Sequence, residues 1–196
     1  MIKNQFIITG LYYEELGFKF RKYLDIKKIN SDICKPDIMV IMMNPGSSRP
    51  INGIDNNTEE SLAIPDRTQD QIMEVMQNCD FEYARVLNLS DYREANSNEF
   101  YKMIPVLETE QISHSIFDES RKEDLQALWV NKVPVIFSWG VNPKLKSLAL
   151  NAIKAINITN PIGWQKTDFK WAYYHPLPRI HKNQIEWVTL ISKKLY

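Results

Sequence analysis

Residues 37–50 read DIMVIMMNPGSSRP, an almost continuous apolar run that ends in an Asn-Pro-Gly turn. A run of this length and composition is typical of a strand that is buried on both faces of a parallel sheet. Residues 133–138 (VPVIFS) repeat the pattern, and residues 84–89 (ARVLNL) and 171–175 (WAYYH) are also of strand length. We therefore expect core strands at residues 37–43, 84–89, 133–138 and 171–175.

Segments with helical spacing lie between and after these strands. Apolar side chains recur in them at intervals of three and four residues, as on the buried side of an amphipathic helix. The expected helices cover residues 69–78, 119–130, 142–156 and 184–195. This alternation predicts an α/β protein, a three-layer α/β/α sandwich with a central, mainly parallel four-stranded sheet. Residues 18–23 (FKFRKY) alternate aromatic and basic side chains, which predicts an additional N-terminal edge strand or hairpin.

Length and composition favour one domain in a reducing compartment. No Pro/Gly/Ser-rich linker divides the 196 residues, so a single domain over residues 1–196 is expected. The two cysteines stand in unrelated contexts, and no signal peptide or membrane-spanning run occurs, which favours the cytoplasm. The formal net charge is zero. A protein that binds nucleic acid along a wide surface is usually basic, so any nucleic-acid contact should be small and local.

The residues that follow the four strands define the candidate site, because ligands of open α/β sheets bind beyond the carboxyl ends of the strands. These residues are Asn44-Pro45-Gly46, Asn88, Trp139-Gly140 and His175. Each has an ordinary alternative as a turn, a core aromatic or a structural histidine. Their joint presence at one sheet edge favours a functional site there.

These motifs resemble those of the uracil-DNA glycosylase superfamily. Its members carry Gly-x-Asp/Asn-Pro-Gly/Tyr, a strand-ending Asn, a Trp-Gly and a His-Pro-Ser-Pro-like sequence in this order. Residues 42–46 match the first motif with Met in place of Gly, and residues 175–178 match the last with Leu in place of Ser. The chain is more similar still to a family of small uncharacterised bacterial proteins with Asn-Pro-Ser/Gly, Asp-x-Thr, Asn-Leu and His-Pro-Leu. Asp66-Arg67-Thr68 supplies the Asp-x-Thr.

The resemblance implies a uracil-DNA-glycosylase-like fold and a monofunctional DNA glycosylase. Such an enzyme hydrolyses the N-glycosidic bond of a flipped base and leaves an abasic site. By the resemblance, Asn44 positions the attacking water, Asn88 hydrogen-bonds the base, and His175 donates to a base oxygen as charge develops. The other residues that it implies at the base are Pro45, Gly46 and Trp139.

Two further residues bear on the reaction and its substrate. An amide has no useful proton affinity, so Asn44 only orients water and a carboxylate is wanted beside it. The resemblance favours Asp66 over Asp55, although either could instead be a helix cap or a turn residue. Strict uracil enzymes carry Tyr where Gly46 stands, and that Tyr excludes the thymine methyl group. Glycine therefore predicts a 5-substituted pyrimidine, such as hydroxymethylated or glucosylated cytosine in invading phage DNA.

The DNA contacts are expected beside the same turns. Hydroxyl groups, turn N–H groups and cations all bind phosphates. The phosphate candidates are Ser47, Ser48, Arg49 and Arg179. Leu177, or else Ile180, is a candidate wedge for the gap that the flipped base leaves. The alternatives are solvated cations for the arginines and loop packing for Leu177.

The expected partner is one flipped nucleotide of DNA, bound by a monomer that needs neither a cofactor nor a metal. His114 and His181 lack companions at metal-ligand spacing, and the chain contains no P-loop, GxGxxG, GxSxG or HExxH motif. Two other classes stay open, a non-catalytic binder of modified DNA or nucleotides and a hydrolase of free nucleoside derivatives. Zero net charge, Asn44 in place of Asp and Leu177 in place of Ser favour the binder. An α/β domain whose motif matches are accidental also stays open.

Overall fold

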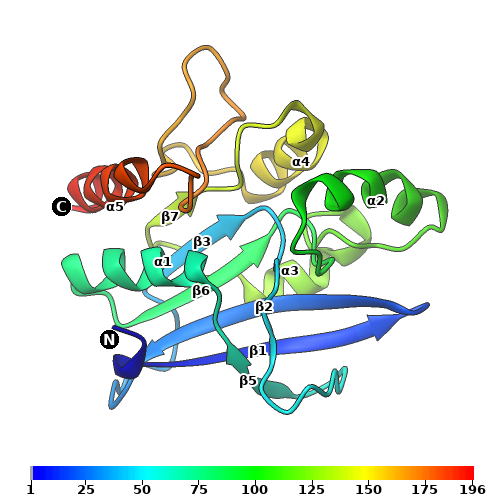
Figure 1. Ribbon diagram of the computed structural model, residues 1–196, viewed down its shortest axis with the longest axis horizontal. Coiled ribbons are helices and arrows are strands. Elements are labelled where there is room, and N and C mark those ends of the chain that lie inside the picture. The colour runs from blue at the N-terminus through cyan, green and yellow to red at the C-terminus, as the bar shows by residue number, and fades with distance from the viewer. Residues whose placement is uncertain (1) are drawn as a thin grey trace.

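One mixed sheet organises the computed structural model, which describes residues 2–196 (Figure 1). Its strands are β1 Phe6–Glu15, β2 Phe18–Lys28, β3 Ile38–Met42, β4 Arg49–Pro50, β5 Glu60–Ile64, β6 Tyr83–Asn88 and β7 Val135–Phe137. Their order in the sheet is β4-β5-β1-β2-β6-β3-β7. Only β6, β3 and β7 are parallel to one another, and the other neighbours are antiparallel. The α/β class is therefore confirmed, whereas the prediction of a mainly parallel four-stranded sheet is wrong.

The described residues also form five α-helices. These are α1 Arg67–Asn78, α2 Ser97–Thr109, α3 Lys122–Leu128, α4 Lys146–Ile156 and α5 His181–Leu195. The four expected helices correspond to α1, α3, α4 and α5, with shifted ends. The helix that was not predicted, α2, begins after the N-cap Asn96 and contains Pro105. Proline usually ends a helix, so its presence hides the apolar spacing of Phe100, Ile104 and Leu107.

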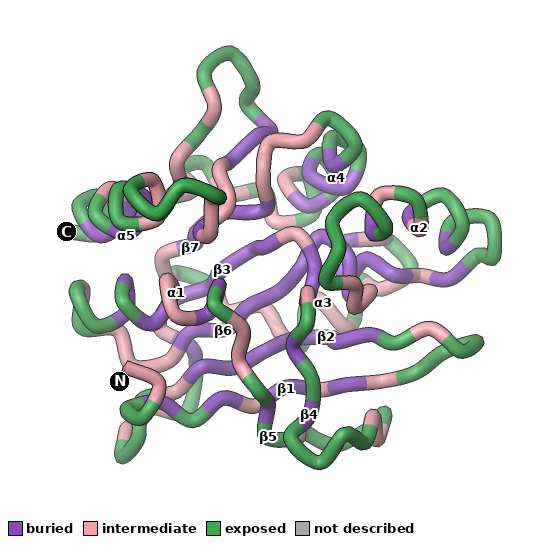
Figure 2. The backbone as a smooth tube through the Cα atoms, in the orientation of Figure 1, coloured by how far each residue is buried: buried purple, intermediate pink, exposed green. Residues whose placement is uncertain are grey.

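The helices lie against both faces of the sheet, as a three-layer arrangement requires (Figure 1). Alternate residues of β3 belong to two different cores, because successive strand side chains point to opposite faces. Val40 packs in the core that α1 and α5 cover, and Ile41 packs in the core under α2 and α4. All five residues of β3 are buried, and Figure 2 shows this burial along the middle of the sheet. Burial on both faces is the physical reason for the continuous apolar run at residues 38–42.

The N-terminal segment forms a hairpin, as one of the two alternatives predicted. β1 and β2 pair antiparallel and are joined through Leu16 and Gly17, both with positive φ. The expectation of an edge strand is wrong, because β2 lies between β1 and β6. The basic residues of β2 misled that assignment. Arg21 is fully buried and Lys22 forms an ion pair with Asp124, so neither is simply solvated.

Residues 171–175 do not form the fourth parallel strand. Tyr173 makes only isolated bridges, to Gly140 and to Gln165. The tyrosine ring instead packs edge-on against Trp139, with ring centroids 5.3 Å apart. The apolar aromatic run is thus a core-packed loop segment, and it still delivers His175 to the carboxyl edge of the sheet.

We predict that Gly163→Ala lowers the free energy of unfolding by about 1–3 kcal/mol, the usual cost of overpacking. A Cβ at this position would lie 2.5 Å from Tyr173 Cδ1 and 2.7 Å from the Phe137 carbonyl oxygen. Urea unfolding measures the change, and Thr167→Ala at an exposed position nearby is the control. Equal stability of the two variants would contradict the close packing of Gly163 against Tyr173 and Phe137 of β7.

Candidate functional site

A cavity of about 540 Å³ opens at the carboxyl ends of β3 and β7. Five segments contribute to its lining, within residues 42–47, 66–68, 95–101, 139–140 and 175–179. Three of the strand-end residues expected to meet, Asn44, Trp139 and His175, do line this one cavity. These residues therefore lie together as the sequence predicted, although one of the four supposed strands is a loop, and their role as a functional site stays a prediction.

The side chain of Asn44 is held in one orientation. Its Nδ2 donates to the backbone carbonyl of Tyr92 at 3.2 Å and to that of Glu94 at 2.7 Å. Asn44 is 8% exposed. Because both amide hydrogens are engaged, Oδ1 is the atom left to accept a hydrogen bond from a molecule in the cavity.

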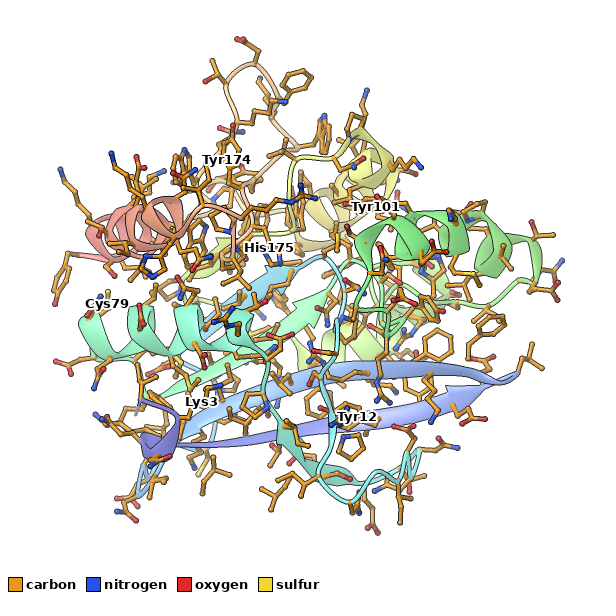
Figure 3. The ribbon with its side chains drawn as sticks, viewed as in Figure 1. Lys3, Tyr12, Cys79, Tyr101, Tyr174 and His175 are labelled. Carbon is orange, nitrogen blue, oxygen red and sulfur yellow. The ribbon has the colours of Figure 1, made fainter. Side chains whose placement is uncertain are left out.

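His175 lines the cavity as an uncharged donor. Its Nδ1 accepts a hydrogen bond from the backbone N–H of Leu177 at 3.2 Å, which places the proton of the neutral ring on Nε2. Burial lowers the pKa of His175 to about 4, and the Asp66 carboxylate opposes part of this shift. At neutral pH the ring is therefore neutral. Figure 3 shows His175 and Tyr101 beside the end of β3.

Asp66 is both a helix cap and a cavity residue. Its Oδ1 accepts from the backbone N–H of Thr68 at 2.8 Å and of Gln69 at 3.3 Å, and the Gln69 side chain completes a capping box. Its Oδ2 faces Gly46, where a Cβ would lie 3.2 Å away. The predicted helix cap is confirmed. The same side chain lines the cavity, and its other predicted role, as the carboxylate of the site, stays a prediction.

The other candidate carboxylate, Asp55, does not line the cavity. It forms ion pairs with Arg93 at 2.5 Å and with Lys19 at 3.5 Å. Both of its oxygens therefore have cationic partners, and Asp66 is the carboxylate that faces the site.

Asn88 lies beneath the site rather than in it. It is fully buried and does not line the cavity. With its amide oxygen toward Arg21, it accepts from Arg21 Nη2 at 3.2 Å and donates to the Asn44 carbonyl at 3.3 Å. In this structure, Asn88 supports the backbone at Asn44. The resemblance places Asn88 at the end of a strand, but it carries no information on where the side chain points. It therefore could not distinguish a residue in the cavity from one beneath it.

The remaining base-binding candidates differ in position. Trp139 lines the cavity, but its Nε1 donates to the Trp171 carbonyl at 2.8 Å and is not available to a ligand. Gly46 also lines it and adopts a positive φ of 61°. Pro45 is buried and shapes the turn without reaching the lining.

The structure separates the phosphate candidates into two pairs. Ser47 and Arg179 are exposed and line the cavity. Ser48 is fully buried, and its hydroxyl is bonded to the Tyr12 hydroxyl at 2.9 Å. Arg49 belongs to β4, pairs with β5 and does not line the cavity. The proposed wedge, Leu177, is half-buried in the lining.

Among the lining residues that sequence reasoning missed, two have long side chains, Arg67 and Tyr101. Arg67, the first residue of α1, is exposed and lines the cavity. Arg67 is the middle residue of the Asp66-Arg67-Thr68 motif, in which the sequence analysis considered only Asp66 and Thr68. Tyr101 was missed with α2. Its hydroxyl donates to Met43 Sδ at 3.5 Å, and burial raises the pKa of that hydroxyl, so Tyr101 supplies a neutral aromatic side chain to the lining.

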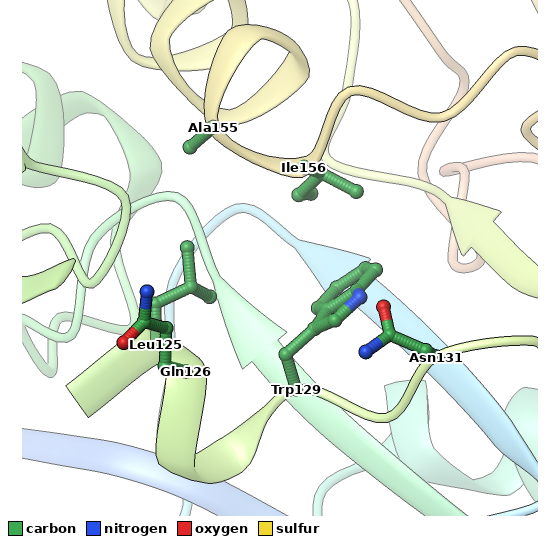
Figure 4. A pocket seen from close by; sticks show the side chains of 6 residues that line it. All are labelled: Leu125, Gln126, Trp129, Asn131, Ala155 and Ile156. Atoms are coloured by element: carbon green, nitrogen blue, oxygen red, sulfur yellow. The ribbon is translucent and has the colours of Figure 1, made fainter. Parts of the chain in front are cut away.

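A second cavity, of about 250 Å³, lies where α3 and α4 end (Figure 4). Its lining consists of Leu125, Gln126, Trp129, Asn131, Ala155 and Ile156. None of the candidate site residues borders it, and it contains no acidic or basic side chain. This cavity therefore offers no charged group to a ligand, unlike the cavity at the strand ends.

Within residues 2–196, no three histidine, cysteine or acidic side chains are placed so that they could hold a metal ion. The same part of the chain contains no helix with the length and apolar character needed to cross a bilayer.

Residues 24–177 match the model of a family described as "Protein of unknown function (DUF1643)". The chain belongs to this family. The matched range includes Asn44, Asp66 and His175 and ends before Arg179. The family description names no activity, so the resemblance to uracil-DNA glycosylases stays a prediction.

Other comparisons add no functional information. No curated protein matches the chain. Among solved structures, a mutant of the feruloyl esterase module from Clostridium thermocellum complexed with sinapinate aligns at 12% identity with a TM-score of 0.29. The alignment covers 78% of this chain and 62% of that one. Similarity this low supports no conclusion about fold or activity.

We predict that His175 titrates near pH 4 in the folded protein. Because the unfolded pKa is about 6.5, the unfolded state binds the proton first, and stability is lost as pH falls from about 6.5 to about 4. Imidazole ¹⁵N chemical shifts measure both the pKa and the Nε2–H tautomer. His175→Gln should remove this contribution to acid sensitivity. A His175 pKa near 6.5 would contradict the desolvation of the ring in the cavity wall.

Proposed function

We propose that the protein is a monofunctional DNA glycosylase that removes a flipped, 5-substituted pyrimidine and leaves an abasic site. One observation carries this proposal. The acceptor oxygen of Asn44, the Oδ2 of Asp66 and the neutral donor His175 belong to three side chains that line one cavity.

These three groups suit hydrolysis of an N-glycosidic bond. The reaction passes through an oxocarbenium-like sugar and a departing base that gains negative charge. Asn44 Oδ1 orients the water, while Asp66 stabilises the cationic sugar and accepts the proton of the water. His175 Nε2–H donates to an oxygen of the departing base. A neutral imidazole can fill this role, because Nε2 carries the N–H donor while Nδ1 accepts from the Leu177 backbone.

The shape of the cavity supports a bulky base. Its volume of about 540 Å³ lies in the range of sites for small organic ligands, roughly 300–1,000 Å³. Gly46 adds no side chain to the wall next to Asp66. Both features favour a pyrimidine with a substituent at carbon 5, such as hydroxymethylated or glucosylated cytosine. Such bases in the DNA of an invading phage would make the protein a defence enzyme.

The cavity lining also supports a small DNA footprint. Arg67, Arg179 and Ser47 are exposed lining residues and suit contacts with phosphates on either side of one flipped nucleotide. Leu177 lines the same cavity as His175, so it is placed to fill the gap that a flipped base leaves in the DNA. A footprint of two arginines is compatible with a net charge of zero. The proposed chemistry uses only side chains, and a monomer suffices for it.

A second candidate is a non-catalytic binder of modified DNA or nucleotides, or a hydrolase of free nucleoside derivatives. The observation in its favour is that position 44 is an amide, fixed by two carbonyls, and not a carboxylate. Salt separates the two kinds of ligand. DNA binding should weaken as ionic strength rises, whereas binding of an uncharged nucleoside should barely change.

The first test is mass spectrometry of bases released from a panel of DNA substrates by the wild type and by Asn44→Ala. The panel holds uracil-containing, hydroxymethylated and glucosylated duplexes and the corresponding single strands. We expect release of a 5-substituted pyrimidine by the wild type and its loss in the variant. Release of uracil alone would contradict the proposed substrate, and no release by the folded protein would favour the second candidate.

We further predict different outcomes for two substitutions of Asp66. Asp66→Asn keeps an N-cap oxygen and should retain stability, yet lower the rate of base release roughly 100-fold or more because the charge is lost. Asp66→Ala should lose the same activity and also about 1 kcal/mol of stability, because the cap is removed. Single-turnover kinetics and urea unfolding measure the two effects. Full activity of Asp66→Asn would rule out a role for the carboxylate.

A further inference from the structure

One short segment, residues 92–94, holds the loop at residues 44–48 at two points. Near the start of the loop, the backbone carbonyls of Tyr92 and Glu94 accept both hydrogen bonds from Asn44 Nδ2. At its end, Arg93 Nε donates to the Ser48 carbonyl at 3.1 Å. The residue between the two carbonyls that orient Asn44 thus also fixes the end of the same loop.

Arg93 is itself fixed from three further directions. Its Nη1 binds Asp55 Oδ1, and its guanidinium lies 5.1 Å from the centroid of the Tyr12 ring. Its backbone N–H donates to the Lys19 carbonyl of β2 at 2.9 Å. The Arg93 and Asp55 side chains are only 12% and 6% exposed. The planar guanidinium contacts Ser48, Asp55 and the Tyr12 ring at once, whereas a lysine ammonium would offer one flexible point of contact.

We propose that Arg93 is a positioning residue for Asn44. Through Ser48 and Asp55 it fixes residues 92–94, so that the carbonyls of that segment keep the amide oxygen of Asn44 available to the cavity. A rotated amide would present N–H groups, which cannot accept a hydrogen bond from water. The effect of Arg93 on rate rests on the proposed glycosylase function, whereas its effect on the Asn44 amide does not.

The molecule contains a matched control for this proposal, the ion pair between Arg85 and Asp25. Arg85 Nε and Nη2 bind the two Asp25 oxygens at 2.8 and 2.7 Å, and Arg85 Nη1 binds the Leu128 carbonyl at 3.2 Å. The exposures of the two side chains, 13% and 4%, resemble those of the Arg93–Asp55 pair. Neither Arg85 nor Asp25 lines the cavity.

The experiment compares Arg93→Lys and Asp55→Asn with Arg85→Lys. The first readout is the side-chain amide signal of Asn44 in ¹H–¹⁵N NMR spectra, assigned by its disappearance in Asn44→Asp. We expect both amide protons to exchange at least about tenfold faster with solvent, and their chemical shifts to move, in Arg93→Lys and Asp55→Asn only. Arg85→Lys should leave this signal as in the wild type, even if it lowers the denaturant midpoint by a similar amount.

The second readout is the rate of base release. In Arg93→Lys, the Asn44 amide should hold the attacking water in a less favourable position. We therefore expect kcat to fall by roughly 10- to 100-fold, while KM changes little. Arg85→Lys should retain the wild-type kcat. Asp55→Asn leaves Arg93 in place, so it tests the anchor if Arg93→Lys proves too unstable.

The outcomes separate this proposal from the proposed function. An unchanged Asn44 signal in both Arg93→Lys and Asp55→Asn would overturn the positioning role, whatever the activity. A perturbed signal in a protein whose wild type releases no base would support the positioning role and contradict the glycosylase. Equal losses of kcat in Arg93→Lys and Arg85→Lys would overturn the proposal, because the effect would then be one of general stability.

Discussion

The parallel pairing of β3 with both β6 and β7 is the constraint on which the site depends. It aligns the carboxyl ends of three strands at one edge, and the register places Met42 of β3 opposite Asn88 of β6. Asn88 therefore lies beside the backbone of Asn44 and donates to it from below. The ladder is stable because β3 is buried on both faces, so water does not compete for its hydrogen bonds. The rigid end of this strand gives the Asn44 loop a fixed starting point.

Structural and chemical roles coincide in the residues around that loop. Asp66 begins α1 with one oxygen and faces the cavity with the other. His175 accepts from the chain through Nδ1, which leaves Nε2 as its donor. Arg93 binds the Ser48 carbonyl of the loop with Nε and the Asp55 carboxylate with Nη1. Each side chain is held by part of its polar surface, so little conformational entropy remains to be lost when a ligand binds. A substitution at any of them therefore changes packing and chemistry together, and variants such as Asp66→Asn are needed to separate the two.

The parts that the sequence predicted well are those with a single dominant physical signal. β3 and β7 are continuous apolar runs, and α1, α4 and α5 have clear apolar spacing beside solvated faces. Asn44 reaches the cavity because it follows a recognisable strand, and Asp66 was identified through the Asp-x-Thr motif of the resemblance. His175 also lines the cavity, although the strand expected before it is a loop. The failures have the opposite character. Residues 171–175 have the composition of a buried strand, but their aromatic rings pack as a loop against Trp139. Tyr101 was hidden in a helix that contains Pro105. The direction of the Asn88 amide depends on the buried Arg21 of β2, which neighbours β6 in the sheet but is far away in sequence, so no local pattern encodes the contact.

The conformation of Gly46 has an evolutionary consequence. Its φ of 61° is one that residues with a Cβ rarely adopt, and a Cβ there would crowd the Asp66 carboxylate. A single mutation at this position would therefore strain the turn before it could narrow the pocket. The width of the cavity beside Gly46 is thus set by the backbone conformation of the turn. Substitutions at this position are therefore disfavoured. Selection for a narrower range of ligands would act more easily through side chains on other elements, such as Tyr101 on α2, where the backbone is regular. A change in the shape of the cavity is therefore easier to make on the helix than on the turn.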